Sequence, residues 1–235
     1  SNLTEEGSKR SREKLGVVTT MDNCEVVKNA NIVILAVKPQ FYEEVISQIK
    51  GCLTPDHMIV GIAPGKTLAW LEEKCEQPLK VVRLMPNTPA QVGEGMTGAC
   101  ANDRVTKEDL DQILAITNSF GRTEVVPERL MDAVGAVSGC SPAYVFMFIE
   151  AMADAAVAQG MPRKQAYKFA AQSVLGAAKM VLETGEHPGV LKDAVCSPGG
   201  TTIAAVAELE KSGLRSSVIE AQRACVQKSR DMSKE

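Results

Sequence analysis

The hydrophobic rhythm of the sequence changes near residue 126, and this change constrains the fold more than any single motif. Up to Val126, short β-rich apolar runs alternate with stretches of helical spacing, an order typical of α/β domains. From Pro127 onward the β-rich runs disappear, and Ala, Leu, Met, Glu, Lys and Gln recur at helical spacing. We therefore expect an α/β domain over residues 1–126 and an all-helical domain over residues 127–235.

In the α/β domain we expect a parallel sheet with helices on both faces. Ile32–Val37 is apolar throughout, which is typical of a strand buried on both faces. The strands are expected at Val17–Thr19, Asn31–Val37, Met58–Ala63, Lys80–Leu84, Met96–Ala101 and Arg122–Val126, and the helices at Gln40–Lys50, Leu68–Cys75 and Thr106–Phe120.

Glycine and proline divide the second half into separate helices. Pro142 interrupts the first of them, because proline lacks an amide proton and disfavours helical geometry at Ser141. The helices are expected at Pro127–Gln159, Arg163–Glu183, Val190–Ala194, Thr201–Lys211 and Arg215–Met232.

The composition excludes several classes of protein. With 235 residues, 45% hydrophobic residues and a net charge of −3, the chain has no basic field for nucleic acid or an anionic membrane. We find no apolar run long enough for a membrane span, and the polar, acidic start is unlike a signal peptide. The seven cysteines lack CxxC spacing, so we expect mostly reduced, buried thiols in a cytoplasmic protein.

Successive predicted strands of the first half end in small or rigid residues. Lys38-Pro39 follows one strand, Pro64-Gly65 the next, and Met85-Pro86-Asn87 the one after. Ligands of open parallel sheets bind outside the carboxyl ends of the strands, so these segments predict one shared crevice. The alternative is that Pro and Gly only terminate strands.

In the second half, Ser197-Pro198-Gly199-Gly200-Thr201-Thr202 precedes a predicted helix. Free amide protons at a helix start, the favourable end of the helix dipole and two glycines together outline an anion site. An ordinary capped helix start is the alternative. The two histidines, His57 and His187, lack metal-ligand spacing, so we expect no metal site, and His187 is interpreted as a structural turn residue.

These motifs, in this order and spacing, resemble the pyrroline-5-carboxylate reductase family over essentially the whole chain. The resemblance is carried by Val37-Lys38-Pro39, Met85-Pro86-Asn87-Thr88-Pro89, Ser138–Tyr144, and His187-Pro188-Gly189 followed by Ser197–Ile203. The resemblance implies reduction of 1-pyrroline-5-carboxylate to L-proline by hydride from NADPH or NADH, the last step of proline biosynthesis. It also implies a Rossmann-like dinucleotide-binding domain, followed by a helical substrate and dimerisation domain that makes a homodimer or higher homo-oligomer.

The resemblance also assigns roles to residues. Thr202 would be catalytic, and Ser197, Gly200, Thr201 and Thr202 would hold the substrate. The hydroxyl and amide groups of Ser1 and Asn2 suit a 2′-phosphate, so we expect NADP, with NAD as the alternative. The other cofactor residues would be Asn23, Ala36, Val37, Lys38, Pro39, Ala63, Pro64, Gly65, Asn87 and Thr88.

The sequence departs from the family in two places. No G-x-G-x-x-G turn precedes Ser1, so the dinucleotide domain looks partial, without an N-terminal strand–helix–strand of roughly 30 residues. If Val17–Thr19 is the third strand in the order 3-2-1-4-5-6, its sheet has a central gap, and we expect the chain as given to fold poorly and bind no dinucleotide. Cys140 and Ser141 stand where the family commonly has glycine.

Two other functions compete with this one. A β-hydroxyacid dehydrogenase-like reductase shares the domain plan but needs a catalytic lysine, and Lys164, Lys168 and Lys179 have no glycine-rich catalytic setting. A non-catalytic oligomeric scaffold would use the Ala-rich helices for assembly alone. NADPH oxidation with pyrroline-5-carboxylate distinguishes the scaffold from the enzyme.

Overall fold

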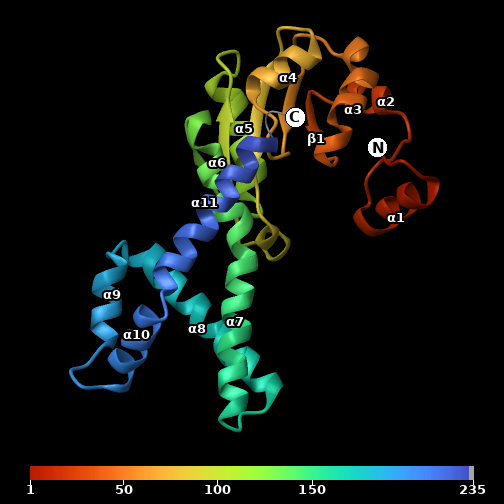
Figure 1. Ribbon diagram of the computed structural model, residues 1–235. Coiled ribbons are helices and arrows are strands. Elements are labelled where there is room, and N and C mark those ends of the chain that lie inside the picture. Colours follow the sequence, from red (N-terminus) through yellow and green to blue (C-terminus); the bar gives the residue numbers. More distant parts are fainter. Residues whose placement is uncertain (233–235) are drawn as a thin grey trace. The chain divides into compact units, whose positions relative to one another are not determined.

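The computed structural model describes residues 1–232. Its chain divides into two compact units, residues 1–139 with 225–235 and residues 140–224. The first unit contains the sheet and the second contains only helices (Figure 1). These units are defined by contacts, and the functional boundary between residues 126 and 127 stays a prediction.

A five-stranded sheet in the order β1-β2-β3-β4-β5 forms the centre of the first unit. The strands β1, β2 and β3 are parallel, β4 is antiparallel to β3, and β5 is parallel to β4. The prediction of a parallel sheet is therefore wrong at β4, because the chain between Met85 and Gly95 is too short for a crossover. The strands are β1 (Ile32–Leu35), β2 (Met58–Gly61), β3 (Lys80–Met85), β4 (Gly95–Ala101) and β5 (Gly121–Val125).

Helices cover both faces of this sheet, as predicted. Ile46 of α3 and Leu71 of α4 pack with Ile59 in one buried cluster, and Ile113 of α5 packs with Val60 in another. The α-helices of this unit are α1 (Glu5–Leu15), α2 (Asn23–Lys28), α3 (Tyr42–Ile49), α4 (Leu68–Cys75), α5 (Lys107–Asn118) and α6 (Met131–Val134). The 3₁₀ turns are η1 (Pro39–Phe41), η2 (Lys50–Cys52), η3 (Thr88–Val92) and η4 (Glu128–Leu130).

Two predictions about the start of the sheet are wrong. Val17–Thr19 is a loop between α1 and α2, and Val18 is 98% exposed because no strand lies beside it. The expected strand order, which used this segment as the third strand, is therefore absent from the described sheet. Ile34 of β1 is 45% exposed, so the prediction that Ile32–Val37 is buried on both faces is wrong. The reason is that β1 lies at the edge of the sheet, beyond the strands that α5 covers.

The second unit is helical, as predicted. Helices α7 and α8 contact each other, and Ala153, Ala166 and Ala170 are buried there. The helices are α7 (Ser141–Ala158), α8 (Arg163–Thr184), α9 (Pro188–Val195), α10 (Thr201–Lys211) and α11 (Leu214–Met232), the last of which continues into the first unit.

The expected interruption near Pro142 takes the form of a π-helical segment, η5 (Gly135–Cys140). Ser138 Oγ donates from this segment to the carbonyl of Val134, the last residue of α6, at 2.9 Å. Pro142 lies in the first turn of α7, and the Ser138 carbonyl four residues before it accepts instead from Asn87 Nδ2 at 3.0 Å, so the chain stays helical. As a result Glu128–Ala158 is long and apolar enough to cross a membrane, contrary to expectation, although length and composition alone support a span only weakly.

The cysteines are less uniform than predicted. Cys24 and Cys52 form a disulfide, while Cys75 and Cys100 are free and buried. The remaining free cysteines, Cys140, Cys196 and Cys225, are exposed or half-buried. The prediction of mostly buried, small hydrophobic thiols is therefore wrong for the majority of them.

Candidate active site

Tyr42 ties together the carboxyl ends of β1 and β2. Its side chain is fully buried, and its hydroxyl donates to the carbonyl of Leu35 at 2.6 Å. The same oxygen accepts from the backbone N–H groups of Ile62 at 2.9 Å and Ala63 at 3.1 Å. Burial raises the pKa of Tyr42, so the hydroxyl stays protonated and keeps its donor. One phenol thus fixes the two loops that were predicted to meet a cofactor.

These two loops share a pocket of about 500 Å³. Pro39 and Pro64, both predicted cofactor residues, line it together with Lys66, Trp70, Gln40, Glu43 and Met232. The Lys66 ammonium lies 4.4 Å from the centre of the Trp70 ring. The predicted crevice is therefore present at the first two strand ends, with rigid prolines, a cation and an aromatic face in its walls.

Glu128 fixes the start of α4, directly after the second loop. Its Oε1 accepts from the backbone N–H of Leu68 at 2.7 Å and from Arg83 Nη1 at 3.2 Å. Arg83 is 3% exposed, whereas the Glu128 side chain is 33% exposed, so only the arginine end of this ion pair is shielded from water. Within the loop, Gly65 adopts φ +77°, a conformation that favours glycine.

The third strand end is organised differently. Asn87 follows β3, and its Oδ1 accepts from the N–H of Met96 at 2.9 Å while its Nδ2 donates to the carbonyl of Ser138 at 3.0 Å. Its amide therefore links the end of β3 to β4 and η5. Neither Asn87 nor the exposed Thr88 lines the pocket at the first two strand ends, and their cofactor role stays a prediction.

The residues predicted for the adenosine end lie together in the first unit. Ser1 Oγ donates to Asn23 Oδ1, and Asn23 Nδ2 donates to Gln48 Oε1 of α3 at 2.6 Å. The N–H of Asn2 donates to the carbonyl of Thr20 at 3.0 Å. Ser1, Asn2 and Asn23 thus form one polar surface near the start of α2.

The predicted substrate segment forms the N-terminus of α10 in the second unit. Gly200 is the N-cap residue, and no side chain caps the helix. Gly199 has φ +69°, and the N–H of Gly200 donates to the carbonyl of Ser197 at 3.0 Å, which closes a tight turn. A Cβ on Gly200 would lie 2.4 Å from Ser197 Oγ, so any larger residue there would displace that hydroxyl. Thr201 and Thr202 occupy the first turn, beside backbone N–H groups that have no side-chain acceptor.

Ser197, Gly200, Thr201 and Thr202 are therefore brought together as predicted, at an open helix start suited to an anion. His187 caps α9 by accepting from the N–H of Gly189 at 3.0 Å, which confirms its structural interpretation. Among residues 1–232, no group of His, Cys, Asp or Glu could hold a metal ion.

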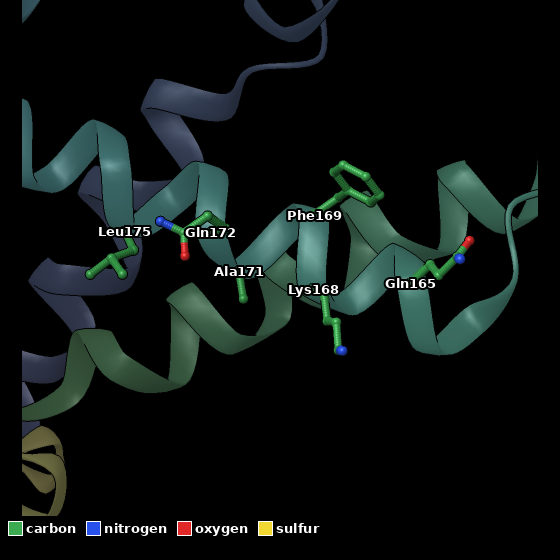
Figure 2. Close-up of a pocket in the computed structure, with 6 residues that line it drawn as sticks. All are labelled: Gln165, Lys168, Phe169, Ala171, Gln172 and Leu175. Carbon is green, nitrogen blue, oxygen red and sulfur yellow. The ribbon is translucent and has the colours of Figure 1, made fainter.

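A second pocket, of about 560 Å³, lies elsewhere in the helical unit. Figure 2 shows its lining, which comes entirely from α8: Gln165, Lys168, Phe169, Ala171, Gln172 and Leu175. None of the predicted site residues belongs to it. Its mainly apolar wall is the outer face of a helix.

Sequence reasoning missed Tyr42 and Glu128, which position the site. Tyr42 follows the first predicted crevice loop by a few residues, and the pattern of a lone tyrosine in an amphipathic helix predicts only a residue of the hydrophobic core. Glu128 follows Pro127 near the domain boundary, and its partner Leu68 is 60 residues away along the chain. A contact at that separation leaves no periodic signal in one sequence.

Comparison with known proteins adds the family context. A family described as pyrroline-5-carboxylate reductase dimerisation matches residues 128–232, and one described as NADP oxidoreductase, coenzyme F420-dependent, matches residues 1–65. Pyrroline-5-carboxylate reductase of Escherichia coli is 54% identical over 94% of this chain and 82% of that protein.

Solved structures agree with this sequence similarity. Pyrroline-5-carboxylate reductase of Coxiella burnetii has a TM-score of 0.91 at 36% identity, over 100% of this chain and 87% of that one. The Plasmodium falciparum enzyme, whose structure has NADP bound, has a TM-score of 0.87 at 34% identity, over 94% and 84% of the two chains.

An α/β unit with open strand ends, followed by helices that include an uncapped helix start, fits a nucleotide-dependent reductase. Within that class, the chain belongs to the pyrroline-5-carboxylate reductase family. It is an oxidoreductase of proline biosynthesis that uses NADP and reduces 1-pyrroline-5-carboxylate to L-proline. The β-hydroxyacid dehydrogenase-like and scaffold alternatives are therefore wrong.

Proposed function

We propose that residues 1–126 supply part of the NADPH site, contrary to the expectation that the chain as given binds no dinucleotide, and that residues 127–235 hold pyrroline-5-carboxylate and pair with a second copy of the chain. The last three residues of this range lie outside the described part. The uncapped N-terminus of α10, with Gly200 as its N-cap and Thr202 in its first turn, is the observation that carries the proposal.

The first unit has groups that fit the two ends of the dinucleotide. At the nicotinamide end, Ala36 to Pro39 and Ala63 to Gly65 offer backbone groups and small or rigid side chains, held by Tyr42. At the adenosine end, Ser1, Asn2 and Asn23 offer hydroxyl and amide groups that suit a 2′-phosphate. This hydroxyl and amide set favours NADP over NAD, whose free ribose hydroxyls an acidic residue usually binds.

The chemistry of the substrate fits the start of α10. The carboxylate of a cyclic imine acid needs several N–H donors, and the first turn of α10 supplies them at the positive end of the helix dipole. The hydroxyl oxygen of Thr202 accepts a hydrogen bond from the protonated ring nitrogen. Ser197 and Thr201 add hydroxyls beside the carboxylate.

NADPH supplies the hydride for the imine carbon. The chain binds and orients the imine so that this carbon faces the donor, and Thr202 keeps the proton on the ring nitrogen, where it raises the electrophilicity of the carbon. The amine of proline retains this proton. Catalysis by positioning needs no nucleophilic attack by the protein, so the hydroxyls of Ser197, Thr201 and Thr202 serve in this proposal only as hydrogen-bonding groups.

Assembly with a second copy is part of the proposal. Phe146, Met147 and Phe169 of the helical unit are each at least 62% exposed, which is unusual for a folded helical domain. The match of residues 128–232 to a dimerisation family supports a homodimer or higher homo-oligomer. The same partner would cover the apolar face of Glu128–Ala158, so we propose a cytoplasmic enzyme without a membrane or nucleic-acid partner.

Replacing Thr202 with Ala tests the substrate role. We expect kcat/KM for pyrroline-5-carboxylate to fall roughly tenfold to a hundredfold, the scale of one hydrogen bond to a charged group. The KM for NADPH should hardly change. Steady-state assays of NADPH oxidation measure both constants.

Ser212→Ala is the matched control, because Ser212 ends the same helix and lies outside the proposed site. Its kcat/KM should equal that of the wild type. If Thr202→Ala retains the wild-type kcat/KM, the assigned role of Thr202 is wrong.

A further inference from the structure

The Cys24–Cys52 disulfide lies next to the proposed adenosine end of the cofactor site. Cys24 follows Asn23 in α2, and Cys52 ends the turn η2 that follows α3. The two Cα atoms are 5.9 Å apart, within the range that a disulfide spans without backbone movement. Both residues are half-buried, so a small thiol or disulfide can reach them.

Two of the other cysteines are poorly suited to redox chemistry. Burial raises the pKa of Cys75 to about 11, and burial together with the nearby Glu128 carboxylate raises the pKa of Cys100 to about 11. Thiols of that kind supply little thiolate, which is the reactive form. Of the seven cysteines, Cys24 and Cys52 are the ones joined in the structure.

The disulfide restrains the residue that the cofactor is expected to meet. Helix α2 has only 6 residues, and Asn23 at its start bonds to Ser1 and to Gln48 of α3. Figure 1 shows α2 beside α3, and the disulfide adds a covalent link between α2 and the end of the α3–η2 segment. With the link broken, the short Asn23–Gln48 hydrogen bond and the burial of Val27 hold the start of α2.

We propose that Cys24 and Cys52 are a reversible thiol–disulfide modification site, whose oxidation fixes Asn23 and tightens the binding of NADPH. This inference rests on the proposed role of Asn23 in binding the cofactor. In the cytoplasm a disulfide is usually transient, so the pair would respond to the redox state of the cell.

The oxidant is a low-molecular-weight disulfide. The thiolate of one cysteine attacks a sulfur of that disulfide, forming a mixed disulfide and releasing one thiolate of the small molecule. The second cysteine, as thiolate, then attacks the mixed disulfide at the protein sulfur, which forms the Cys24–Cys52 bond and releases the second thiolate. The protein loses two electrons and the two thiol protons, and the small disulfide becomes two thiols.

The test uses the full chain in two states, reduced with dithiothreitol or oxidised with glutathione disulfide. Peptide mass spectrometry after alkylation should find Cys24 linked to Cys52 only in the oxidised state. Fluorescence titration should give a Kd for NADPH about threefold to tenfold lower in that state. The thermal midpoint without cofactor should also be several degrees higher, because the link closes a 28-residue segment of the unfolded chain.

Matched variants separate the possible outcomes. Cys52→Ser should stop the reaction at a glutathione adduct on Cys24, and Cys24→Ser with Cys52→Ser should abolish the response of Kd to oxidation. The control variant Cys225→Ser, in α11, should retain the response of the Kd for NADPH to oxidation. Failure of the linked peptide to form would overturn the site, and equal Kd values in both states with the link formed would overturn the coupling. Absence of NADPH binding in either state would instead contradict the proposed cofactor site.

Discussion

The two units of the chain bury very different residues. In the first, Tyr42, Ile59 and Leu71 are fully buried between the sheet and its helices. In the second, the buried residues among 140–224 are Ala153, Ala166 and Ala170, while Phe146 and Phe169 are 62% and 64% exposed. The first unit therefore has a core of its own, whereas the second leaves large apolar side chains exposed, as the proposed assembly with a second copy of the chain requires.

Of the substitutions that we predict to be damaging, the largest effect is expected for those on the surface where that partner would bind. Phe169→Asp combined with Leu175→Asp places two charges on the exposed apolar face of α8. Losing the burial of two large side chains costs about 3–6 kcal/mol of association free energy, a factor of about 10²–10⁴ in Kd. Sedimentation velocity at micromolar concentration should find dissociated, poorly folded and inactive protein.

Val18→Asp in the first unit is the control for this variant, because Val18 is 98% exposed and lies in a loop. It should leave both the assembly and the activity unchanged. A folded, fully active monomer of the Phe169→Asp, Leu175→Asp protein would refute the dependence of the second unit on a partner.

An intermediate effect is expected inside the first unit. Tyr42→Phe removes the hydroxyl that serves Leu35, Ile62 and Ala63, and leaves buried backbone groups without a partner. At about 1–3 kcal/mol for each unsatisfied group, we expect the free energy of unfolding to fall by about 2–4 kcal/mol. The KM for NADPH should rise as well, because both loops lose their anchor.

Urea unfolding compares this variant with Tyr167→Phe, which alters a tyrosine that is 40% exposed in the second unit. That control should change the free energy of unfolding by less than about 0.5 kcal/mol. Equal effects of the two substitutions would mean that the hydroxyl of Tyr42 does not hold the strand ends.

The smallest expected effect on the free energy of unfolding concerns the N-terminal cap of α5 in the first unit. Asp109 completes a capping box with Thr106 at the start of α5, and Lys80 Nζ donates to its carboxylate at 2.8 Å. The Lys80 hydrogen bond, and then that from the Thr106 backbone, hold the pKa of Asp109 below its ordinary value. Asp109→Asn should therefore cost about 1 kcal/mol of unfolding free energy at pH 7.

The pKa of Asp109 is lower in the folded state than in the unfolded state. The contribution of its carboxylate to the free energy of unfolding is therefore fully present above the unfolded pKa of about 4, and it is lost as the pH falls through the folded pKa. The free energies of unfolding of wild type and variant, measured with urea, should differ at pH 7, and the difference should shrink as the pH falls below about 4. Asp111→Asn, on an exposed position of the same helix, should show neither effect. If the difference in unfolding free energy between wild type and Asp109→Asn persists at low pH, the loss of stability comes from packing and not from the charge of Asp109.

Periodic and local signals were sufficient for most elements of the fold. The alternation of β-rich runs and helices located β1 to β5 and α3 to α5 within a few residues, and α10 begins and ends as predicted. The helix α1 was missed although its signals are present: Thr4 as N-cap, acidic residues in the first turn, and Gly16 in the left-handed conformation after the last. Its face is polar, so it lacked the apolar stripe on which the prediction relied.

What the sequence did not reveal depends on distant partners. The direction of β4, the edge position of β1 and the exposure of Ile34 follow from which strands lie beside one another. In the site, the turn at Gly199 and Gly200 was visible because glycine marks backbone geometry directly. Tyr42 and the disulfide of Cys24 with Cys52 were not visible, because each joins segments that one sequence does not pair.

The bond between Leu68 and Glu128 has a consequence for the order in which the protein matures. It closes a segment of 60 residues, so the loop Ala63–Thr67 is synthesised long before the carboxylate that anchors the following helix. Until the ribosome has released Glu128, Thr67 caps α4 without it, and Arg83 lacks its counter-ion. In the nascent chain the proposed cofactor loop therefore lacks this anchor until Glu128, which follows β5, has been released.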